Sequence, residues 1–240
     1  GIFEYKTGLR PALAQLVAEV ESAHRSGLPV AIHAISEEAI VAALHVLSQA
    51  GRTGSTRADR IEHASQMSDW SIRTAANHAL AVCVNPGLLR QRGDIYLRNG
   101  PDGGRLHRYR SLSREGVTLL AASDAPAAGI SVIDSLRAAT TRVAESGGAY
   151  LIDESVSLLD ALSMYTSSPA GWIGDRVRGE LKQGAIADMV AVSGDWCYGL
   201  PADASVVATV VNGRCVFSRE PARWESPDQY PPKRGGLRSI

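Results

Sequence analysis

The chain has 240 residues, 45% of them hydrophobic, which is enough for one large α/β domain or for a domain with an appendage. Lys plus Arg and Asp plus Glu both number 25, so the formal net charge is zero and the composition favours neither a nucleic-acid nor a membrane-surface partner. We find no secretory signal, and no apolar run approaches the roughly 18 residues needed to span a bilayer.

Helical and strand patterns alternate over the first two thirds of the chain. Apolar residues at helical spacing predict helices over 9–25, 37–49, 68–77, 109–115, 131–145 and 157–166. Short apolar runs predict strands over 29–34, 60–64, 80–84 and 117–122, with 2–5 as a fifth. This alternation predicts a parallel sheet covered by helices.

Residues 88–107 form the longest stretch without a clear period. Turn signals are frequent there, including Gly93-Asp94 and Asn99-Gly100-Pro101. Because a loop of this length in a compact domain is usually functional or mobile, we expect an irregular segment that contributes to a site.

The pattern changes after Pro169. Residues 187–193 and 206–217 read as strands, and Asn212-Gly213 within the second is a strong hairpin signal. The remainder is rich in Pro and Gly and reads as an extended tail. We therefore expect α/β units over residues 1–174, a small β unit over 175–218 and a tail over 219–240.

Three cysteines, Cys83, Cys197 and Cys215, are scattered along the chain without CxxC spacing. This arrangement suggests neither a zinc ribbon nor a disulfide framework. We expect three ordinary thiols in a protein of the reducing cytoplasm.

Polar side chains follow three of the expected strands. His33 ends the first apolar run, His63 ends RIEH, and Asp124 follows VTLLAAS. In parallel α/β folds the carboxyl ends of the strands face the catalytic crevice. Imidazole and carboxylate groups are good ligands for divalent metals, so the shared position predicts a metal centre.

Each of these residues also has an ordinary structural explanation. A single histidine after an apolar run is often a hydrogen-bonded core residue, and Ser123-Asp124-Ala125-Pro126 could be an Asx turn or a helix cap. What favours a metal site is the repetition of the position in three successive units. A carboxylate beside a metal-bound water can also take its proton, which makes Asp124 the candidate catalytic residue.

Two further residues have candidate roles near this site. Glu62 precedes His63 on the same strand, so we expect it to point to the opposite face and to orient outer structure. Arg110 could bind a substrate carboxylate or carbonyl, or it could form a surface ion pair. The remaining histidines read as packed or solvated side chains: His24, His45, His78 and His107.

The ordered motifs resemble those of the amidohydrolase superfamily, in its metal-dependent branch that includes the N-substituted formamide deformylases. They are HAISEEA, RIEHAS, NPG, GDIYL, RYRSL and GVTLLAASDAP, followed by GELKQGAIADMVAVS and TVVNGRCVF. The resemblance runs from about residue 8 to residue 218, nearly the whole chain. Each motif alone is weak, whereas the ordered set is specific.

The resemblance implies a TIM-type (β/α)8 barrel with a small β-sandwich domain. It implies His33 and His63 as metal ligands from the fifth and sixth barrel strands. It implies Asp124, after the eighth strand, as a ligand and proton acceptor for the attacking water. The implied cofactor is a divalent metal, zinc in our prediction, with one or two ions in the parent family.

One departure from the family pattern matters. Family members carry a His-x-His pair on their first barrel strand, and no such pair occurs in this sequence. We therefore expect a partial barrel made of the later strands, with the C-terminal portion of the sandwich. The predicted function is hydrolysis of amide-type C–N bonds by metal-activated water, in a truncated or incomplete copy whose own activity is open.

Two other interpretations remain. The first is a non-catalytic amidohydrolase-like domain that binds a small molecule or a partner chain. The second is a small doubly wound domain, which would need a phosphate-binding Gly-rich turn after its first strand, and the sequence has none. We expect a small-molecule substrate, no nucleic acid and no membrane as partners, with a homodimer as one option. The substrate itself is not specified by these motifs.

Overall fold

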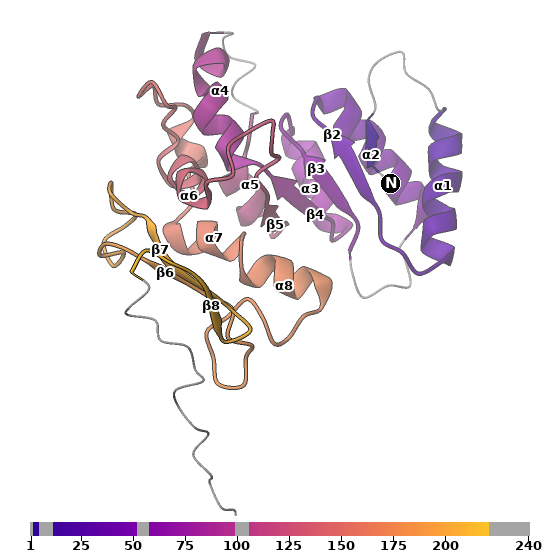
Figure 1. Ribbon diagram of the computed structural model, residues 1–240. Coiled ribbons are helices and arrows are strands. Elements are labelled where there is room, and N and C mark those ends of the chain that lie inside the picture. Colours follow the sequence, from indigo (N-terminus) through magenta and orange to yellow (C-terminus); the bar gives the residue numbers. More distant parts are fainter. Residues whose placement is uncertain (1, 5–11, 52–57, 99–105, 221–240) are drawn as a thin grey trace, which may run out of the picture. The chain divides into compact units, whose positions relative to one another are not determined.

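The computed structural model describes residues 2–4, 12–51, 58–98 and 106–220 (Figure 1). The chain divides into two compact units, Gly1–Gly179 and Glu180–Ile240. Our expected domain limits at residues 174 and 218 stay predictions. Most of the expected tail, residues 221–240, lies outside the described residues.

The first unit contains a parallel sheet in the order β1-β2-β3-β4-β5. Its strands are β1 (Ile2–Glu4), β2 (Ala31–Ala34), β3 (Arg60–His63), β4 (Ala81–Val84) and β5 (Thr118–Ala121). Each strand pairs with the next along the chain, so β1 and β5 are the edges of this sheet within the described part of the chain. The predicted α/β fold is confirmed, and the described strands form an open sheet.

Helices connect these strands and follow the last of them. They are α1 (Leu13–Arg25), α2 (Glu37–Ala50), α3 (Asp69–Asn77), α4 (Pro86–Arg98), α5 (Tyr109–Arg114), α6 (Val132–Thr141), α7 (Leu158–Ser163) and α8 (Ser167–Ile173), with a short 3-10 helix η2 (Ile152–Glu154). All except α4, α8 and the short η2 lie where the periodicity predicted a helix. Serine side chains accept a hydrogen bond from the backbone three residues later where α2, α3, α6 and α7 begin. Such caps satisfy an N–H group that has no partner inside the helix, which is why these helices begin where they do.

Helix α4 corrects the prediction of an irregular stretch over residues 88–107. Pro86 opens the helix, and a proline is well tolerated at a first helical position because it has no N–H to leave unpaired. Gly93 lies inside the helix at a close approach, where an added Cβ would come within 2.7 Å of the Cβ of Ala144. Its role is packing and not a turn. Residues 99–105 lie outside the described residues.

Helix α8 was also not predicted, because the alternation of helices and strands was taken to end at about residue 166. Its Trp172 packs against Ala81, Cys83 and Leu120 on one face of the sheet. The indole Nε1 donates a hydrogen bond of 3.0 Å to the carbonyl oxygen of Ala58. This helix therefore covers the β4–β5 part of that face.

The second unit is an antiparallel sheet in the order β6-β7-β8 within its described residues. The strands are β6 (Met189–Val192), β7 (Val206–Val211) and β8 (Arg214–Ser218). Asn212 and Gly213 connect β7 to β8 with φ of 49° and 76°. Positive φ at both turn residues suits a tight hairpin, so the predicted hairpin is confirmed.

Candidate functional site

The structure brings together the two histidines of the predicted metal centre. His33 is the third residue of β2, and His63 is the last residue of the neighbouring strand β3. Their ring centroids are 4.5 Å apart, with an angle of 71° between the ring planes. Both side chains are partly exposed, so both imidazoles are accessible to a ligand.

His63 reaches His33 because the chain turns sharply at the end of β3. The backbone of His63 has a φ of 68°, and that of Ala64 has a φ of 46°. Left-handed backbone is uncommon for residues other than glycine and is concentrated at functional sites. Here the left-handed backbone ends the alternation of side chains between the two faces of the sheet. This change accounts for the contact between the rings of His33 and His63.

Glu62 lies on the same sheet face as His33, which contradicts the expectation that it orients outer structure. The register of β2 and β3 pairs His33 with Glu62, and laterally paired residues of a parallel sheet share a face. Glu62 accepts a hydrogen bond from Arg60 on this face. We had placed Glu62 by assuming that its side chain alternates with that of His63. The alternation does not hold there, because the backbone of His63 is left-handed and not extended.

Cys83 continues the same row, since β4 pairs it with Glu62. Burial, and then the negative charge of Glu62, raise the pKa of the Cys83 thiol to about 12. Because only the thiolate is a good nucleophile or metal ligand, Cys83 behaves as a neutral core side chain at neutral pH.

Asp124 does not join the histidine pair. It follows β5, which is separated from β3 by β4. Two strand spacings in a sheet amount to about 10 Å. Among the described residues, no three His, Cys, Asp or Glu side chains are placed to hold one metal ion. Two imidazoles fit part of a zinc site, and a third donor is not assembled with them.

Asp124 nevertheless has an unusual backbone. Its φ is 58°, and its carbonyl oxygen accepts hydrogen bonds from the N–H groups of Ala127 and Ala128 at 2.8 and 3.3 Å. The turn is therefore built by the backbone of Asp124. Its carboxylate is partly exposed and forms no hydrogen bond or ion pair with another described residue.

His107 is a residue near this site that sequence reasoning passed over. Its side chain is only 3% exposed, and neither ring nitrogen has a hydrogen-bond partner among the described residues. Burial, then the positive charge of Arg142 and the proximity of His63, lower the pKa of His107 to about 3. Its imidazole is therefore neutral at physiological pH. Its place in a segment taken for an irregular loop hid this burial.

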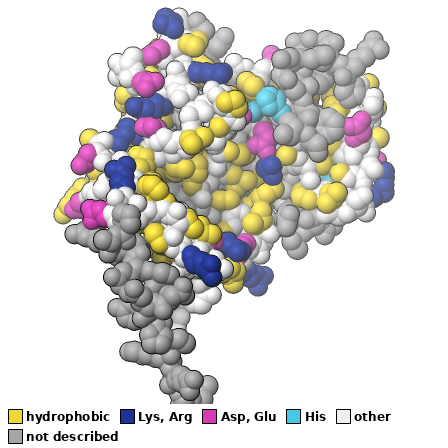
Figure 2. Space-filling view, viewed as in Figure 1, with side chains coloured by type: hydrophobic (Ala, Val, Ile, Leu, Met, Phe, Trp, Pro, Cys, Tyr) yellow, Lys and Arg dark blue, Asp and Glu magenta, His cyan; other side chains and the backbone are white. Residues whose placement is uncertain are grey.

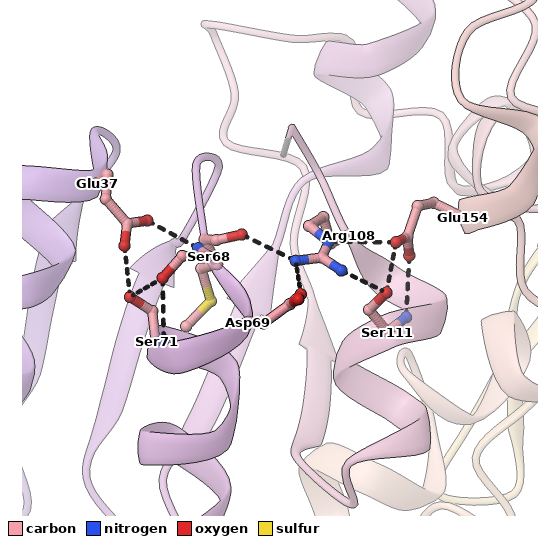
Figure 3. A network of polar contacts seen from close by, with 8 residues as sticks. Glu37, Ser68, Asp69, Ser71, Arg108, Ser111 and Glu154 are labelled. Atoms are coloured by element: carbon pink, nitrogen blue, oxygen red, sulfur yellow. Dashed lines mark hydrogen bonds and ion pairs between the residues drawn. The ribbon is translucent and has the colours of Figure 1, made fainter. Parts of the chain in front are cut away.

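Arg108, and not Arg110, holds the polar network at this end of the unit (Figure 3). Its guanidinium donates to Asp69 at 2.6 Å, to the carbonyl oxygen of Met67 at 3.3 Å and to Glu154 at 3.3 Å. Hydrogen bonds to the two carboxylates raise the pKa of Arg108 despite its partial burial. Arg110 is exposed on α5, so its suggested contact with substrate stays a prediction.

A third acidic residue, Glu37, extends the network towards α2. Glu37 accepts hydrogen bonds of 2.8 Å from the Ser68 N–H and from the Ser71 hydroxyl (Figure 3). Carboxylates at the starts of helices also interact favourably with the helix dipole. The network therefore fixes the starts of α2, α3 and α5 beside the strand ends that carry the histidines.

One face of the molecule combines apolar and polar side chains. On the face shown in Figure 2, hydrophobic side chains gather in the region of β4 and β5, and histidine and acidic side chains lie beside them. Polar groups next to an apolar surface are typical of small-molecule sites.

Comparison with known proteins identifies the family. The model of the amidohydrolase family matches residues 5–217. The chain belongs to the amidohydrolase family. This confirms the resemblance read from the ordered motifs.

Individual relatives agree with this assignment. LONG AFTER FAR-RED 3 of Arabidopsis thaliana is 30% identical over 205 residues, 82% of this chain and 35% of the relative. The N-substituted formamide deformylase of Arthrobacter pascens is 27% identical over 207 residues, 82% of this chain and 38% of the enzyme. The chain spans 35–39% of the length of the curated relatives it matches.

A solved structure shares the fold as well. It is an uncharacterized metal-dependent hydrolase from Pyrococcus furiosus, with a TM-score of 0.61 and 25% identity. The similarity covers 74% of this chain and 36% of the hydrolase. In the part of this chain that the structure describes, no helix is long and apolar enough to cross a membrane.

Proposed function

We propose that this chain provides part of the metal site of a hydrolase that cleaves amide-type C–N bonds in a small molecule. The observation that carries the proposal is the contact of His33 with His63, 4.5 Å between ring centroids, at the carboxyl ends of adjacent strands. Membership of the amidohydrolase family and the similarity to a metal-dependent hydrolase support it. The amide bond rests on the family name and on the formamide deformylase among the relatives.

The proposed roles follow from the chemistry of each side chain. His33 and His63 would hold a divalent ion through neutral imidazole nitrogens, and with a carboxylate as a further donor zinc is the preferred metal. A bound ion of this kind lowers the pKa of its water towards neutrality. Asp124 would take up a proton at its carboxylate and return it to the leaving nitrogen. Arg110 is our candidate contact for a substrate carboxylate or carbonyl.

The test is a zinc titration of the purified 240-residue chain, with metal content measured after dialysis. We expect bound zinc, and we expect His33→Ala and His63→Ala to weaken zinc binding by more than about tenfold, since removing even outer partners of metal ligands has effects of this size. His45→Ala, at an exposed histidine of α2, is the matched control and should bind as the wild type does. Equal zinc affinity in the wild type and in His33→Ala would refute the proposed ligand pair.

A second candidate function is a non-catalytic domain that binds a small molecule or a partner chain. The described residues favour it, because no third His, Cys, Asp or Glu side chain is assembled with the histidine pair. It predicts no zinc retained by the chain after dialysis, whereas the hydrolase proposal predicts zinc retained through both histidines. The same titration therefore separates the two.

A further inference from the structure

The turn that follows His63 is held on one side by the strand that carries His33. The Ala64 N–H donates to the Ala34 carbonyl at 3.0 Å, and the Gln66 N–H donates to the Ile35 carbonyl at 3.0 Å. These bonds extend the β2–β3 pairing beyond His63. The two hydrogen bonds hold Ala64 and Gln66 against β2. The carbonyl of Ser65, which lies between them, points away from β2.

The other side of the turn is held by a segment far along the chain. The His107 N–H donates to the Ser65 carbonyl at 2.7 Å, and Leu106 forms an antiparallel bridge with Gln66. Ser65 is 7% exposed, so its carbonyl needs a protein partner. We call residues 106–107 the strap.

The strap is in turn held by Arg142, which ends α6. Its Nη1 donates to the His107 carbonyl at 3.0 Å, and its Nε donates to the Tyr150 carbonyl at 3.3 Å. The guanidinium carbon lies 5.1 Å from the ring centroid of Tyr109. Three segments therefore meet at one side chain.

Burial of the Arg142 side chain is energetically unfavourable. Its exposed fraction is 0%, and among the described residues its hydrogen bonds go to backbone carbonyls and not to a carboxylate. Burial lowers the pKa of its guanidinium. An isolated buried charge destabilises a fold unless its hydrogen bonds compensate. If the position served packing alone, a leucine or methionine would give a more stable fold. The hydrogen bonds to two backbone carbonyls are what only an arginine supplies here.

We propose that Arg142 is a positioning residue that sets the orientation of His63 through the strap. Left-handed backbone at His63, Ala64 and His107 is unfavourable without external support. Hydrogen bonds run from Arg142 to His107 and from His107 to Ser65, two residues beyond His63. The role as a metal-positioning device rests on the proposed function, whereas the mechanical link to His63 does not.

The experiment uses the full chain with Arg142→Met, which keeps the length of the side chain and removes its donors. We expect the imidazole NMR signals of His63 in the metal-free protein to shift and broaden. We also expect zinc affinity to fall at least tenfold. Arg142→Lys, which retains a charged donor for one carbonyl, should restore part of both properties, and it is the variant to use where Arg142→Met fails to fold.

A stability-matched control separates positioning from general weakening. Leu47→Ala removes a buried side chain of α2, a helix that forms no hydrogen bond with the strap among the described residues. It should lower stability while leaving the His63 signals and the zinc affinity unchanged. Unchanged His63 signals in Arg142→Met, or an equal disturbance in Leu47→Ala, would overturn the proposal. If the wild type binds no zinc but Arg142→Met still disturbs His63, the link stands and the hydrolase proposal falls.

Discussion

At the scale of single residues, the clearest property of this protein is a histidine that stays neutral because it is buried. His107 lies next to Tyr96, with 5.3 Å between the ring centroids, and beneath the charge of Arg142. Burial disfavours the charged imidazolium because it excludes water, and the positive charge of Arg142 disfavours it by repulsion. Folding therefore requires His107 to give up any proton that it carries in the unfolded chain.

This burial predicts a pH dependence of stability. The pKa of His107 is about 3 in the folded protein and 6.5 for the free side chain. As pH falls from 6.5 towards 3, the unfolded chain binds a proton that the folded chain does not, so stability falls by up to about 1.4 kcal/mol per pH unit from this group. Above 6.5 the contribution is constant.

Urea unfolding of His107→Phe between pH 7 and pH 4 measures this contribution, because phenylalanine keeps a ring beside Tyr96 and cannot titrate. We expect a shallower loss of stability with acid than in the wild type. His45→Phe, at an exposed position of α2, controls for the change of one histidine to an aromatic residue. Parallel stability curves for wild type and His107→Phe would show that the folded protein protonates His107 readily.

At the scale of elements, contacts with a distant segment explain why Gly93 and Asp94 lie in a helix and not in a turn. Gly93 and Asp94 were read as a turn pair, yet both are helical in α4. Gly93 lies against Ala144, and Asp94 accepts a hydrogen bond from the Ser146 hydroxyl. The glycine is there because the segment after α6 comes too near for a side chain.

Gly93→Ala tests this packing. Alanine favours a helix over glycine by about 1 kcal/mol, whereas overpacking a close contact costs about 1–3 kcal/mol. With 2.7 Å between the added Cβ and that of Ala144, we expect the clash to dominate and the free energy of unfolding to fall. The double variant Gly93→Ala, Ala144→Gly should regain stability, as measured by denaturant unfolding. A more stable Gly93→Ala single variant would mean that α4 has room to move.

At the scale of the whole molecule, charge balance is the property that the composition controls. The chain carries 25 basic and 25 acidic residues, and its isoelectric point is near 7.2. Molecules near zero net charge repel one another weakly and associate readily. Each unit also exposes apolar side chains, for example Ile130 in the first and Tyr198 in the second.

We therefore expect self-association of the chain to be greatest near pH 7. Static light scattering at low salt should give the least repulsive interaction between molecules at about pH 7 and a more repulsive one at pH 9, where acidic groups outnumber basic ones. Added salt should reduce the difference, because it screens charge. Identical scattering at both pH values would show that apolar contacts and not charge govern association.

Sequence patterns alone determined the fold class, the strand order along the chain and the family. These follow from local chemistry: apolar strands, serine caps and the Asn212-Gly213 hairpin each act within a few residues of themselves. The placement of His33 and His63 at strand ends also came from the pattern, and the structure brings their rings together. Their roles as metal ligands stay proposals.

Tertiary structure decided what depends on contacts between distant segments. Whether Gly93 is a turn or a packing residue depends on Ala144, and whether His107 is solvated or buried depends on Arg142 and Tyr96. The orientation of Glu62 depends on the register of β2 and β3. A sequence window contains none of these partners, since hydrogen bonding, burial and register are set by neighbours in space.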